Sequence, residues 1–163
     1  MITLELFPVT AEDRPFLQQL YASTRWHEVA LAGLATEQAE AFLTMQFNAQ
    51  SQHYRQHYPR AQCDRVVCDG VSVGRLYVDR SADDIRIVDI ALLPEHRQRG
   101  IGTRLLQPIL AEARQVGVSV SLHVDKQNSA RQWYRRLGFV TVEDRGVYDF
   151  MRYRAVDPVS FSP

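Results

Sequence analysis

Residues 85–116 constrain the fold more than any other part of the chain. The apolar run over residues 85–93 predicts a buried strand, which must end at Pro94 because proline cannot donate to the ladder. Apolar side chains over residues 101–116 recur at the spacing of one helical face and predict a helix. The segment between them is short and rich in arginine and glycine. This stretch therefore indicates a strand, a tight loop and a helix in direct succession.

The loop between this strand and helix is suited to binding an anion. Gly100 and Gly102 carry no Cβ, so a ligand can approach the backbone closely. The first N–H groups of a helix have no intrahelical acceptor and lie at the positive end of its dipole, which favours phosphate or pyrophosphate. A helix start that needs small residues for packing explains two glycines equally well. The chain lacks the Walker pattern GxxxxGK[ST], and Arg104 and Leu105 stand where a Rossmann fingerprint needs its third glycine.

The rest of the chain predicts a mixed sheet with three further helices. Asp69-Gly70 joins two β-rich runs and indicates a hairpin. A strand–helix–strand crossover makes residues 118–124 parallel to residues 85–93. The expected strands are residues 2–6, 65–68, 71–78, 85–93, 118–124, 139–143 and 147–154. The other helices are expected after a capping box at residues 10–13, from Thr36 to a stop at Pro59, and over residues 128–137.

Several local expectations depend on these helices. Residues 25–28, Arg-Trp-His-Glu, are expected in a loop after the first helix, and Pro108 is expected to kink the helix that contains it. His53 and His57 have the spacing of two metal ligands on one helix face, but aromatic cover of a sheet edge is the favoured interpretation because no third ligand is evident. The apolar face of the second helix is expected to comprise Ala39, Phe42, Leu43, Met45 and Phe47.

Length, charge and cysteine content exclude several classes of protein. With 163 residues the chain has the size of one domain, and its 19 basic and 19 acidic residues argue against nucleic acid or an anionic membrane as a partner. No apolar run approaches the roughly 20 residues of a membrane span, and no signal-peptide pattern is visible. Cys63 and Cys68 are too few for a disulfide framework. These features predict a cytoplasmic protein.

Two motifs resemble one known family. Residues 97–102, Arg-Gln-Arg-Gly-Ile-Gly, match the pattern Arg/Gln-x-x-Gly-x-Gly/Ala. Residues 128–139 resemble the segment N-x-A-x-x-x-Y-x-x-x-G-F, in the right order and at a suitable distance. Both are typical of the GCN5-related N-acetyltransferase (GNAT) superfamily, and the resemblance covers roughly residues 64–154. The first sixty residues are similar only in being helical.

The resemblance implies a fold and a domain organisation. It implies an α/β (α+β) fold with a mixed, mostly antiparallel, twisted sheet of about seven strands and four helices. The implied order is β-α-α-β-β-β-α-β-α-β-β, which the expected elements also follow. A single acetyltransferase domain is expected over residues 1–156, followed by a loose tail over residues 157–163 that contains proline and serine.

The resemblance also implies acetyl-CoA as co-substrate and no metal. The loop amides would bind the pyrophosphate, and backbone groups of the preceding strand would lie along the pantetheine arm and polarise the thioester carbonyl. Asn128 would hydrogen-bond the cofactor arm, or act only as a helix cap. The implied cofactor-binding residues are Leu92, Leu93, Arg97, Gln98, Arg99, Gly100, Ile101, Gly102, Thr103, Asn128 and Ala130.

Two acid–base tasks remain for the chemistry. Tyr134 matches the general-acid tyrosine of many family members, and a tyrosine with an ordinary pKa of about 10 is protonated at neutral pH and can donate to the leaving thiolate. Removal of a proton from the amine is less clear from the sequence, because Val88 and Asp89 stand where family members often carry a glutamate. Asp89 is either the base or part of an ion pair with Arg86 or Arg75. His123 and water are the alternatives.

The sequence therefore predicts an N-acetyltransferase that transfers acetyl directly to a primary amine of a small molecule, peptide or protein. The alternative is a catalytically silent acyl-CoA-binding regulatory module of the same fold. A nucleotide-binding α/β protein would need a fully parallel sheet, against which the hairpin at Asp69-Gly70 argues. The acceptor is not identified, and a homodimer is left open. By resemblance, the acceptor site is expected near Trp26, His27 and Glu28.

Overall fold

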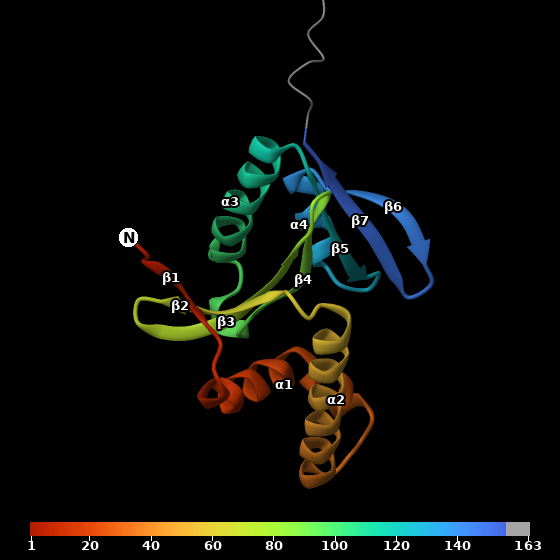
Figure 1. The fold of residues 1–163 in the computed structure, drawn as a ribbon. Helices are drawn as coiled ribbons and strands as arrows, with labels where there is room; N and C mark the ends of the chain where they lie inside the picture. Colours follow the sequence, from red (N-terminus) through yellow and green to blue (C-terminus); the bar gives the residue numbers. More distant parts are fainter. Residues whose placement is uncertain (156–163) are drawn as a thin grey trace, which may run out of the picture. The chain divides into compact units, whose positions relative to one another are not determined.

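The computed structural model describes residues 1–155, in which seven strands and four helices follow the predicted order (Figure 1). Two short 3-10 turns, Ala11–Asp13 and Pro94–His96, precede α1 and α3. The helices are α1 (Arg14–Leu31), α2 (Thr36–His57), α3 (Ile101–Val116) and α4 (Ala130–Leu137). The strands are β1 (Leu4–Pro8), β2 (Gln62–Cys68), β3 (Val71–Arg80), β4 (Asp84–Leu92), β5 (Ser119–Asp125), β6 (Val140–Arg145) and β7 (Tyr148–Arg154).

The strands form one seven-stranded sheet in the order β1-β2-β3-β4-β5-β7-β6. β4 and β5 pair in parallel, with Asp84 opposite Ser119, as the crossover through α3 predicts. β1 and β2, β5 and β7, and β6 and β7 pair antiparallel. The α/β fold with a mostly antiparallel sheet and four helices is therefore confirmed.

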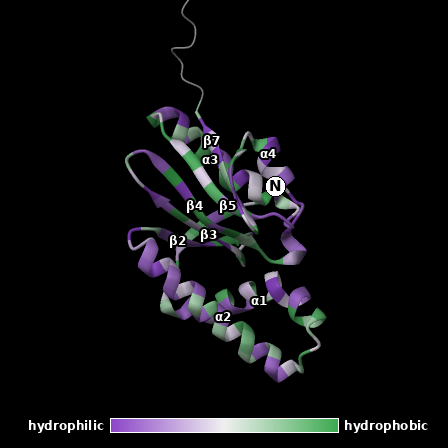
Figure 2. Cartoon of the chain, turned by 90° about the vertical axis from the view of Figure 1, so that its right-hand side faces the viewer, coloured by the Kyte–Doolittle hydropathy of each residue, from purple (hydrophilic) through white to green (hydrophobic). Residues whose placement is uncertain are grey.

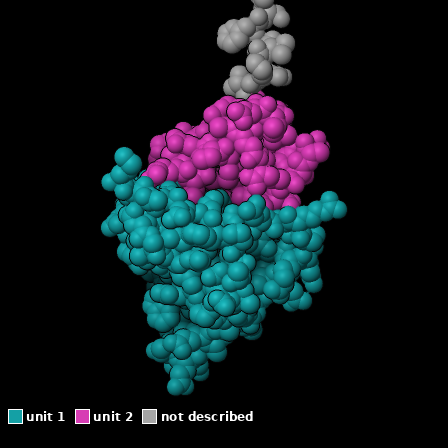
Figure 3. Space-filling model, turned by 60° about the vertical axis from the view of Figure 1, so that its left-hand side comes forward, with its two compact units in different colours: residues 1–77, 89–102 teal, residues 78–88, 103–163 magenta. Residues whose placement is uncertain are grey.

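The chain divides into two compact units, coloured separately in Figure 3. Unit 1 comprises residues 1–77 and 89–102, and unit 2 comprises residues 78–88 and those from 103 onward. In unit 1, Val29 of α1 is buried against Ala39 and Leu43 of α2. In unit 2, Phe139 and Met151 are among the most deeply buried side chains. The single domain over residues 1–156 stays a prediction, and the tail predicted over residues 157–163 lies outside the described residues.

The loop predicted at residues 25–28 is wrong, because α1 continues to Leu31. The cause is tertiary packing. Val29 is only 5% exposed because it packs against α2. Burial of Val29 stabilises the helical conformation of residues 25–28, although their polar and aromatic side chains show no helical periodicity. Within that segment Arg25 and Glu28 form an exposed ion pair at 3.5 Å, one helical turn apart.

The predicted apolar face of α2 is only partly correct. Ala39, Leu43 and Phe47 are buried, whereas Phe42 is 39% exposed and Met45 is 58% exposed. The three buried residues are spaced by four, which is one stripe of a helix, and the two exposed residues lie beside it. Figure 2 shows hydrophilic and hydrophobic residues interleaved along α2. The N-cap of α2 is Ala35, one residue before the predicted Thr36, which is the first residue of the helix.

Other element boundaries differ from the prediction by at most three residues. Asp69 and Gly70, with φ of 50° and 81°, form the predicted turn between β2 and β3. β6 extends to Arg145, so the last turn lies one to two residues later than predicted. α3 continues through Pro108 without interruption over its assigned length. Over residues 1–155, no helix has both the length and the apolar character needed to cross a bilayer.

Candidate functional site

The loop that follows β4 turns through two residues with left-handed backbone. Leu92 ends the strand, and α3 begins at Ile101. Between them Gln98 has a φ of 61° and Gly100 a φ of 79°. This region is uncommon for residues with a Cβ and readily adopted by glycine. The backbone therefore changes direction sharply just before the helix starts.

Hydrogen bonds hold the first half of the loop against the end of the sheet. The N–H of Leu93 donates to the carbonyl of Val73 at 2.8 Å, and the N–H of His96 donates to the carbonyl of Leu93 at 3.0 Å. The Nε of Arg97 donates to the carbonyl of Leu92 at 2.9 Å. The Leu93 N–H and the Leu92 carbonyl are thus both engaged within unit 1.

The second half of the loop leads into the N-terminus of α3. Gln98, Arg99 and Gly100 are all exposed. The first four N–H groups of any α-helix have no intrahelical acceptor, and in α3 this set begins at Ile101. The helix dipole adds partial positive charge at the same place, and Arg99 adds a full charge. This arrangement fits a phosphate or pyrophosphate group.

β3 and β4 approach closely where the loop begins. A Cβ added at Gly74 would lie 2.3 Å from the carbonyl oxygen of Ala91 and 2.7 Å from Cδ2 of Leu92. Both distances are well below van der Waals contact, and the first partner is backbone, which cannot rotate away. Gly74 therefore sets the spacing between the strands at the end of β4.

We expect Gly74→Ala to lower the free energy of unfolding by about 1–3 kcal/mol, the usual cost of forcing extra volume into a packed site. Urea denaturation with and without the substitution measures it. Val71→Ala is the control, because Val71 lies on the same strand and is 56% exposed, so we expect a loss below about 1 kcal/mol. Equal stability of Gly74→Ala and the wild type would contradict the close approach.

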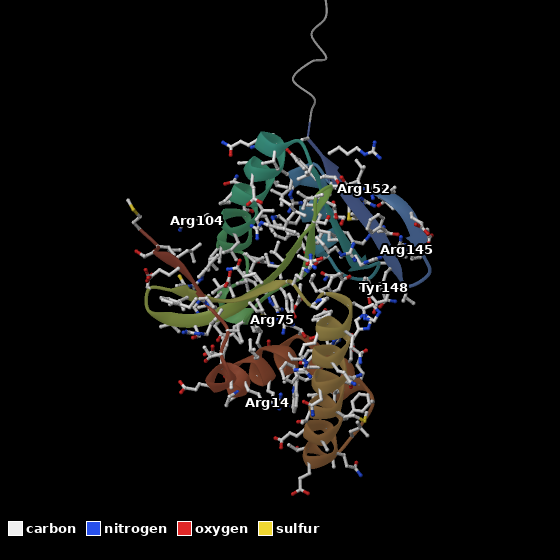
Figure 4. All side chains as sticks on the ribbon, in the orientation of Figure 1. Arg14, Arg75, Arg104, Arg145, Tyr148 and Arg152 are labelled. Carbon is white, nitrogen blue, oxygen red and sulfur yellow. The ribbon has the colours of Figure 1, made fainter. Side chains whose placement is uncertain are left out.

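A buried arginine occupies the centre of the sheet in unit 1. The side chain of Arg75 is 7% exposed, and its Nε and Nη2 both donate to Oδ2 of Asp89, at 3.1 and 2.5 Å. Nη2 also donates to Oε1 of Gln50 in α2 at 3.2 Å. The guanidinium carbon lies 5.9 Å from the ring centre of Tyr54 and 5.6 Å from that of Tyr77. We call these five residues the Arg75 cluster; Figure 4 labels its central arginine.

The Arg75 cluster changes the acid–base properties of the groups around it. Burial opposes the charge of Arg75, but Asp89 more than offsets this and raises the Arg75 pKa. Burial, followed by the negative charge of Asp89, raises the pKa of Tyr54 far above its ordinary value. Burial likewise raises the pKa of the Cys63 thiol to about 11. The thiolate is the nucleophilic form, so Cys63 is not poised to carry an acyl group at neutral pH.

α4 holds the second predicted motif, within unit 2. Tyr134 is 7% exposed, and its ring centre lies 4.8 Å from that of Trp133 and 5.7 Å from that of Phe139. Nε1 of Trp133 donates to Oγ1 of Thr103, the third residue of α3, at 2.9 Å. The Tyr134 ring is therefore buried and packs against two other aromatic rings.

Asn128 fixes the start of α4. Its Oδ1 accepts from the N–H of Ala130 at 2.9 Å, and its carbonyl accepts from the N–H of Arg131 at 3.2 Å. The bond from the Ala130 N–H to Oδ1 of Asn128 forms an Asx turn just before the helix, which begins at Ala130, two residues later than predicted. Asn128 is therefore not the N-cap, which is Ser129, and its contact with a cofactor stays a prediction.

Comparison with known proteins identifies the family. A family model described as an acetyltransferase (GNAT) domain matches residues 30–154, which is most of the chain. The chain belongs to the GNAT acetyltransferase family. The match includes both motifs, the loop before α3 and the segment from Asn128 to Phe139. A search of curated protein sequences finds no match.

Solved structures with the same GNAT fold have low sequence identity to the chain. The PaiA N-acetyltransferase from Thermoplasma acidophilum, in complex with coenzyme A, is 19% identical with a TM-score of 0.70, and the match covers 93% of this chain and 99% of that one. An acetyltransferase from Thermus thermophilus is 23% identical with a TM-score of 0.65, covering 93% and 97%. The ribosomal-protein-S18-alanine N-acetyltransferase from Escherichia coli is 15% identical with a TM-score of 0.59, covering 99% of both chains. These likenesses establish the fold.

The predicted site residues are divided between the two units. Unit 1 contains Asp89, the end of β4 and most of the GNAT loop, together with Trp26, His27 and Glu28 of α1. Unit 2 contains the two α4 motif residues, Asn128 and Tyr134. Trp26 is 48% exposed, which is compatible with a role in binding. Among residues 1–155, His53 and His57 are not part of any group of three side chains that could hold a metal.

Two groups of residues were not singled out from the sequence. Gln50 and Tyr54 contact Arg75 from α2, and nothing in their own segment signals this role. Arg75 itself is signalled, because a charged residue between Gly74 and Leu76 interrupts an otherwise apolar strand. Arginines of β6 and β7 form the second group, and they are described below.

Proposed function

We propose that this protein is an acetyl-CoA-dependent N-acetyltransferase of the cytoplasm, which transfers acetyl directly to a primary amine. The loop before α3 carries this proposal. It combines left-handed residues at Gln98 and Gly100, exposed arginine charge and a helix N-terminus, in a chain of the GNAT family. The low Cys63 reactivity expected from its raised pKa favours direct transfer over a cysteine-bound intermediate.

Acetyl-CoA would supply the acetyl group as an activated thioester. The residues from Arg97 to Thr103 would hold its pyrophosphate through backbone N–H groups and guanidinium charge. Arg97 is fixed through Nε to the end of β4, which leaves its two terminal nitrogens for a phosphate. Thr103 already accepts a hydrogen bond from Trp133, so its own hydroxyl hydrogen remains for an acceptor.

Tyr134 is the residue we assign to protonation of the departing CoA thiolate. Its ring is buried and packs against Trp133 and Phe139, and this packing would help to position the acid. This assignment derives from the match to the GNAT motif.

Asp89 is the residue we assign to binding or deprotonating the amine. Of the two arginines considered from the sequence, Arg75 is the one that pairs with Asp89. Both hydrogen bonds of this ion pair go to Oδ2 of Asp89. The side chain is 25% exposed, so Oδ1 can still receive a proton or an ammonium group. We therefore propose that Arg75 orients Asp89 and that Asp89 faces the acceptor amine.

We expect Asp89→Asn to have two separable effects. The free energy of unfolding should fall by about 3 kcal/mol, because Arg75 would keep its buried charge without a counter-ion. This value is the low end for breaking a buried ion pair, since the Asp89 side chain is partly exposed. If Asp89 accepts the proton, the acid limb of the kcat/KM profile should also flatten or shift. Denaturation and a pH–rate profile measure the two. An unchanged profile with reduced stability would leave Asp89 a structural role only.

By resemblance, Trp26, His27 and Glu28 on α1 are the acceptor-binding candidates. The E. coli relative, by its name, acts on an alanine of ribosomal protein S18. We therefore keep both a protein and a small amine as candidate acceptors for this chain.

An amine panel tests the proposed function. The protein is incubated with acetyl-CoA and single amines, including polyamines, amino acids, aminoglycosides and peptide N-termini, and release of free CoA thiol is followed. We expect at least one amine to give release well above the amine-free rate, with an acetylated product by mass spectrometry. CoA binding without turnover of any amine would instead support a catalytically silent regulatory module.

A further inference from the structure

One face of the sheet in unit 2 gathers arginines from neighbouring strands. The registers place Arg86 of β4 opposite Ser121 of β5, and Ser121 opposite Arg152 of β7. His123 of β5 stands opposite Phe150 of β7. Side chains alternate along a strand, and directly paired residues point to the same face. These residues therefore share one face.

β6 adds a third arginine to this face. Arg145 pairs with Tyr148 of β7, two residues before Phe150, and so shares the face of Phe150. Figure 4 shows Arg145, Tyr148 and Arg152 on the β6–β7 hairpin. We name the set Arg86, His123, Arg145, Phe150 and Arg152 the arginine face.

The three arginines converge on a single aromatic ring. The guanidinium carbons of Arg86, Arg145 and Arg152 lie 5.5, 4.5 and 5.2 Å from the ring centre of Phe150. Any two of these charges are therefore separated by no more than about 11 Å, which is close to the screening length of about 8 Å at physiological salt. The ring attracts each cation but carries no net charge, so it does not neutralise them.

His123 does not neutralise them either. Its Nε2 lies 2.6 Å from Nη1 of Arg145, and its Nδ1 contacts Nη2 of Arg86. A neutral imidazole has one acceptor nitrogen and one N–H. Only one of the two arginine contacts can therefore be a hydrogen bond, and the other guanidinium faces a second donor.

Two aspartates share this face, Asp84 two residues before Arg86 and Asp125 two residues after His123, and Asp84 accepts hydrogen bonds from the hydroxyls of Ser119 and Ser121. Of the described residues, Glu143 alone forms an ion pair with any of the three arginines, at 3.0 Å from Arg145. The Nε atoms of Arg86 and Arg152 are buried and have no hydrogen-bond partner. Besides its contact with His123, Arg86 donates through Nη1 to the Ser121 hydroxyl, at 3.5 Å. Each of these two guanidinium groups thus has one buried donor without an acceptor.

We propose that the arginine face binds an oxyanion, a carboxylate or phosphate group of a small molecule. Guanidinium groups recognise both through paired N–H···O bonds, and the anion would accept from the terminal N–H groups of the arginines, including the guanidinium that faces the N–H of His123. It would also relieve the repulsion among the three charges. The proposal concerns unit 2 alone and does not depend on acetyl transfer.

Calorimetric titration with inorganic phosphate and with citrate, at fixed ionic strength, tests the proposal. We expect saturable binding by the wild type, and at least tenfold weaker binding by Arg152→Gln. The matched control is Arg135→Gln, which removes the same charge from an exposed position on α4 and should keep wild-type affinity. Both variants retain the loop before α3, so an anion that binds to that loop contributes equally to the two titrations.

A second variant acts in the opposite direction. Glu143→Gln removes the carboxylate that competes with the ligand, and its side chain is 56% exposed, so it should fold normally and bind several-fold more tightly. A stronger response to phosphate than to citrate would indicate a phosphorylated ligand, and the reverse a carboxylate. The proposal is overturned if the wild type shows no saturable binding, if Arg152→Gln and Arg135→Gln bind equally, or if Glu143→Gln binds more weakly.

Discussion

Tyr134→Phe should lower kcat by roughly tenfold to a hundredfold while leaving the affinity for CoA nearly unchanged. The departing thiolate needs a proton or a strong hydrogen bond as the C–S bond breaks, and a positioned acid typically contributes about 10²–10⁴-fold. A CoA thiol is fairly acidic for a leaving group, so the loss of kcat should fall at or below the low end of this range. Loss of kcat with unchanged binding is the pattern of an interaction made only in the transition state.

Packing should contribute little to this effect. The substitution removes one hydroxyl and almost no volume from a ring that packs against Trp133 and Phe139. Tyr153→Phe is the matched control, since its ring contacts the same Phe139 at 5.8 Å and its hydroxyl bonds only Arg114 among the contacts described. We expect the control to keep wild-type kcat. The rates should be measured under single-turnover conditions, because slow product release would hide a slower chemical step.

A Tyr134→Phe protein with wild-type single-turnover rate on its true acceptor would return Tyr134 to a packing role. Water would then be the better candidate for the proton donor. Equal losses in the Tyr134 and Tyr153 variants would point to disturbed packing around Phe139 and would also contradict the assignment.

Local signals explain what the sequence predicts correctly. The strand before Pro94, the hairpin at Asp69-Gly70 and the helix from Ile101 each depend on residues close together in the chain. The parallel pairing of β4 and β5 follows from a general rule about crossovers. For these elements the local preference and the final packing agree, so the pattern alone was sufficient.

Tertiary packing explains where the prediction fails. The segment from Arg25 to Glu28 has no helical period, and it is helical because Val29 beyond it is buried against α2. Phe42 and Met45 are apolar, but only one stripe of α2 faces a partner. Neither outcome is encoded in the segment concerned, because both depend on a surface supplied by another helix.

Partner choice within the sheet is another feature that the sequence leaves open. Arg75 and Arg86 were equally plausible partners for Asp89, and the structure pairs Asp89 with Arg75. Arg86 instead contacts His123 and Phe150. Strand register over long sequence separations decides these contacts, and hydrophobic periodicity gives no information about them.

Gly102→Asp should weaken CoA binding by tenfold or more, or at least about 1.4 kcal/mol. Gly102 is the second residue of α3, in the loop proposed to hold the pyrophosphate. A carboxylate there would repel the phosphates and occupy the space that the absent Cβ leaves open. Acidic residues in the first turn stabilise a helix, so the protein should remain folded. Gly102→Asn is the matched variant, with the same size and no charge.

Calorimetric titration of CoA into the wild type, Gly102→Asn and Gly102→Asp is the most direct test of the central claim that this loop binds the acetyl donor. Circular dichroism should first establish that all three proteins are folded. The account predicts tight binding by the wild type, weaker binding by Gly102→Asn and the weakest by Gly102→Asp. Unchanged CoA affinity in a folded Gly102→Asp protein would contradict the assignment of residues 97–103 and, with it, the proposed function of the loop.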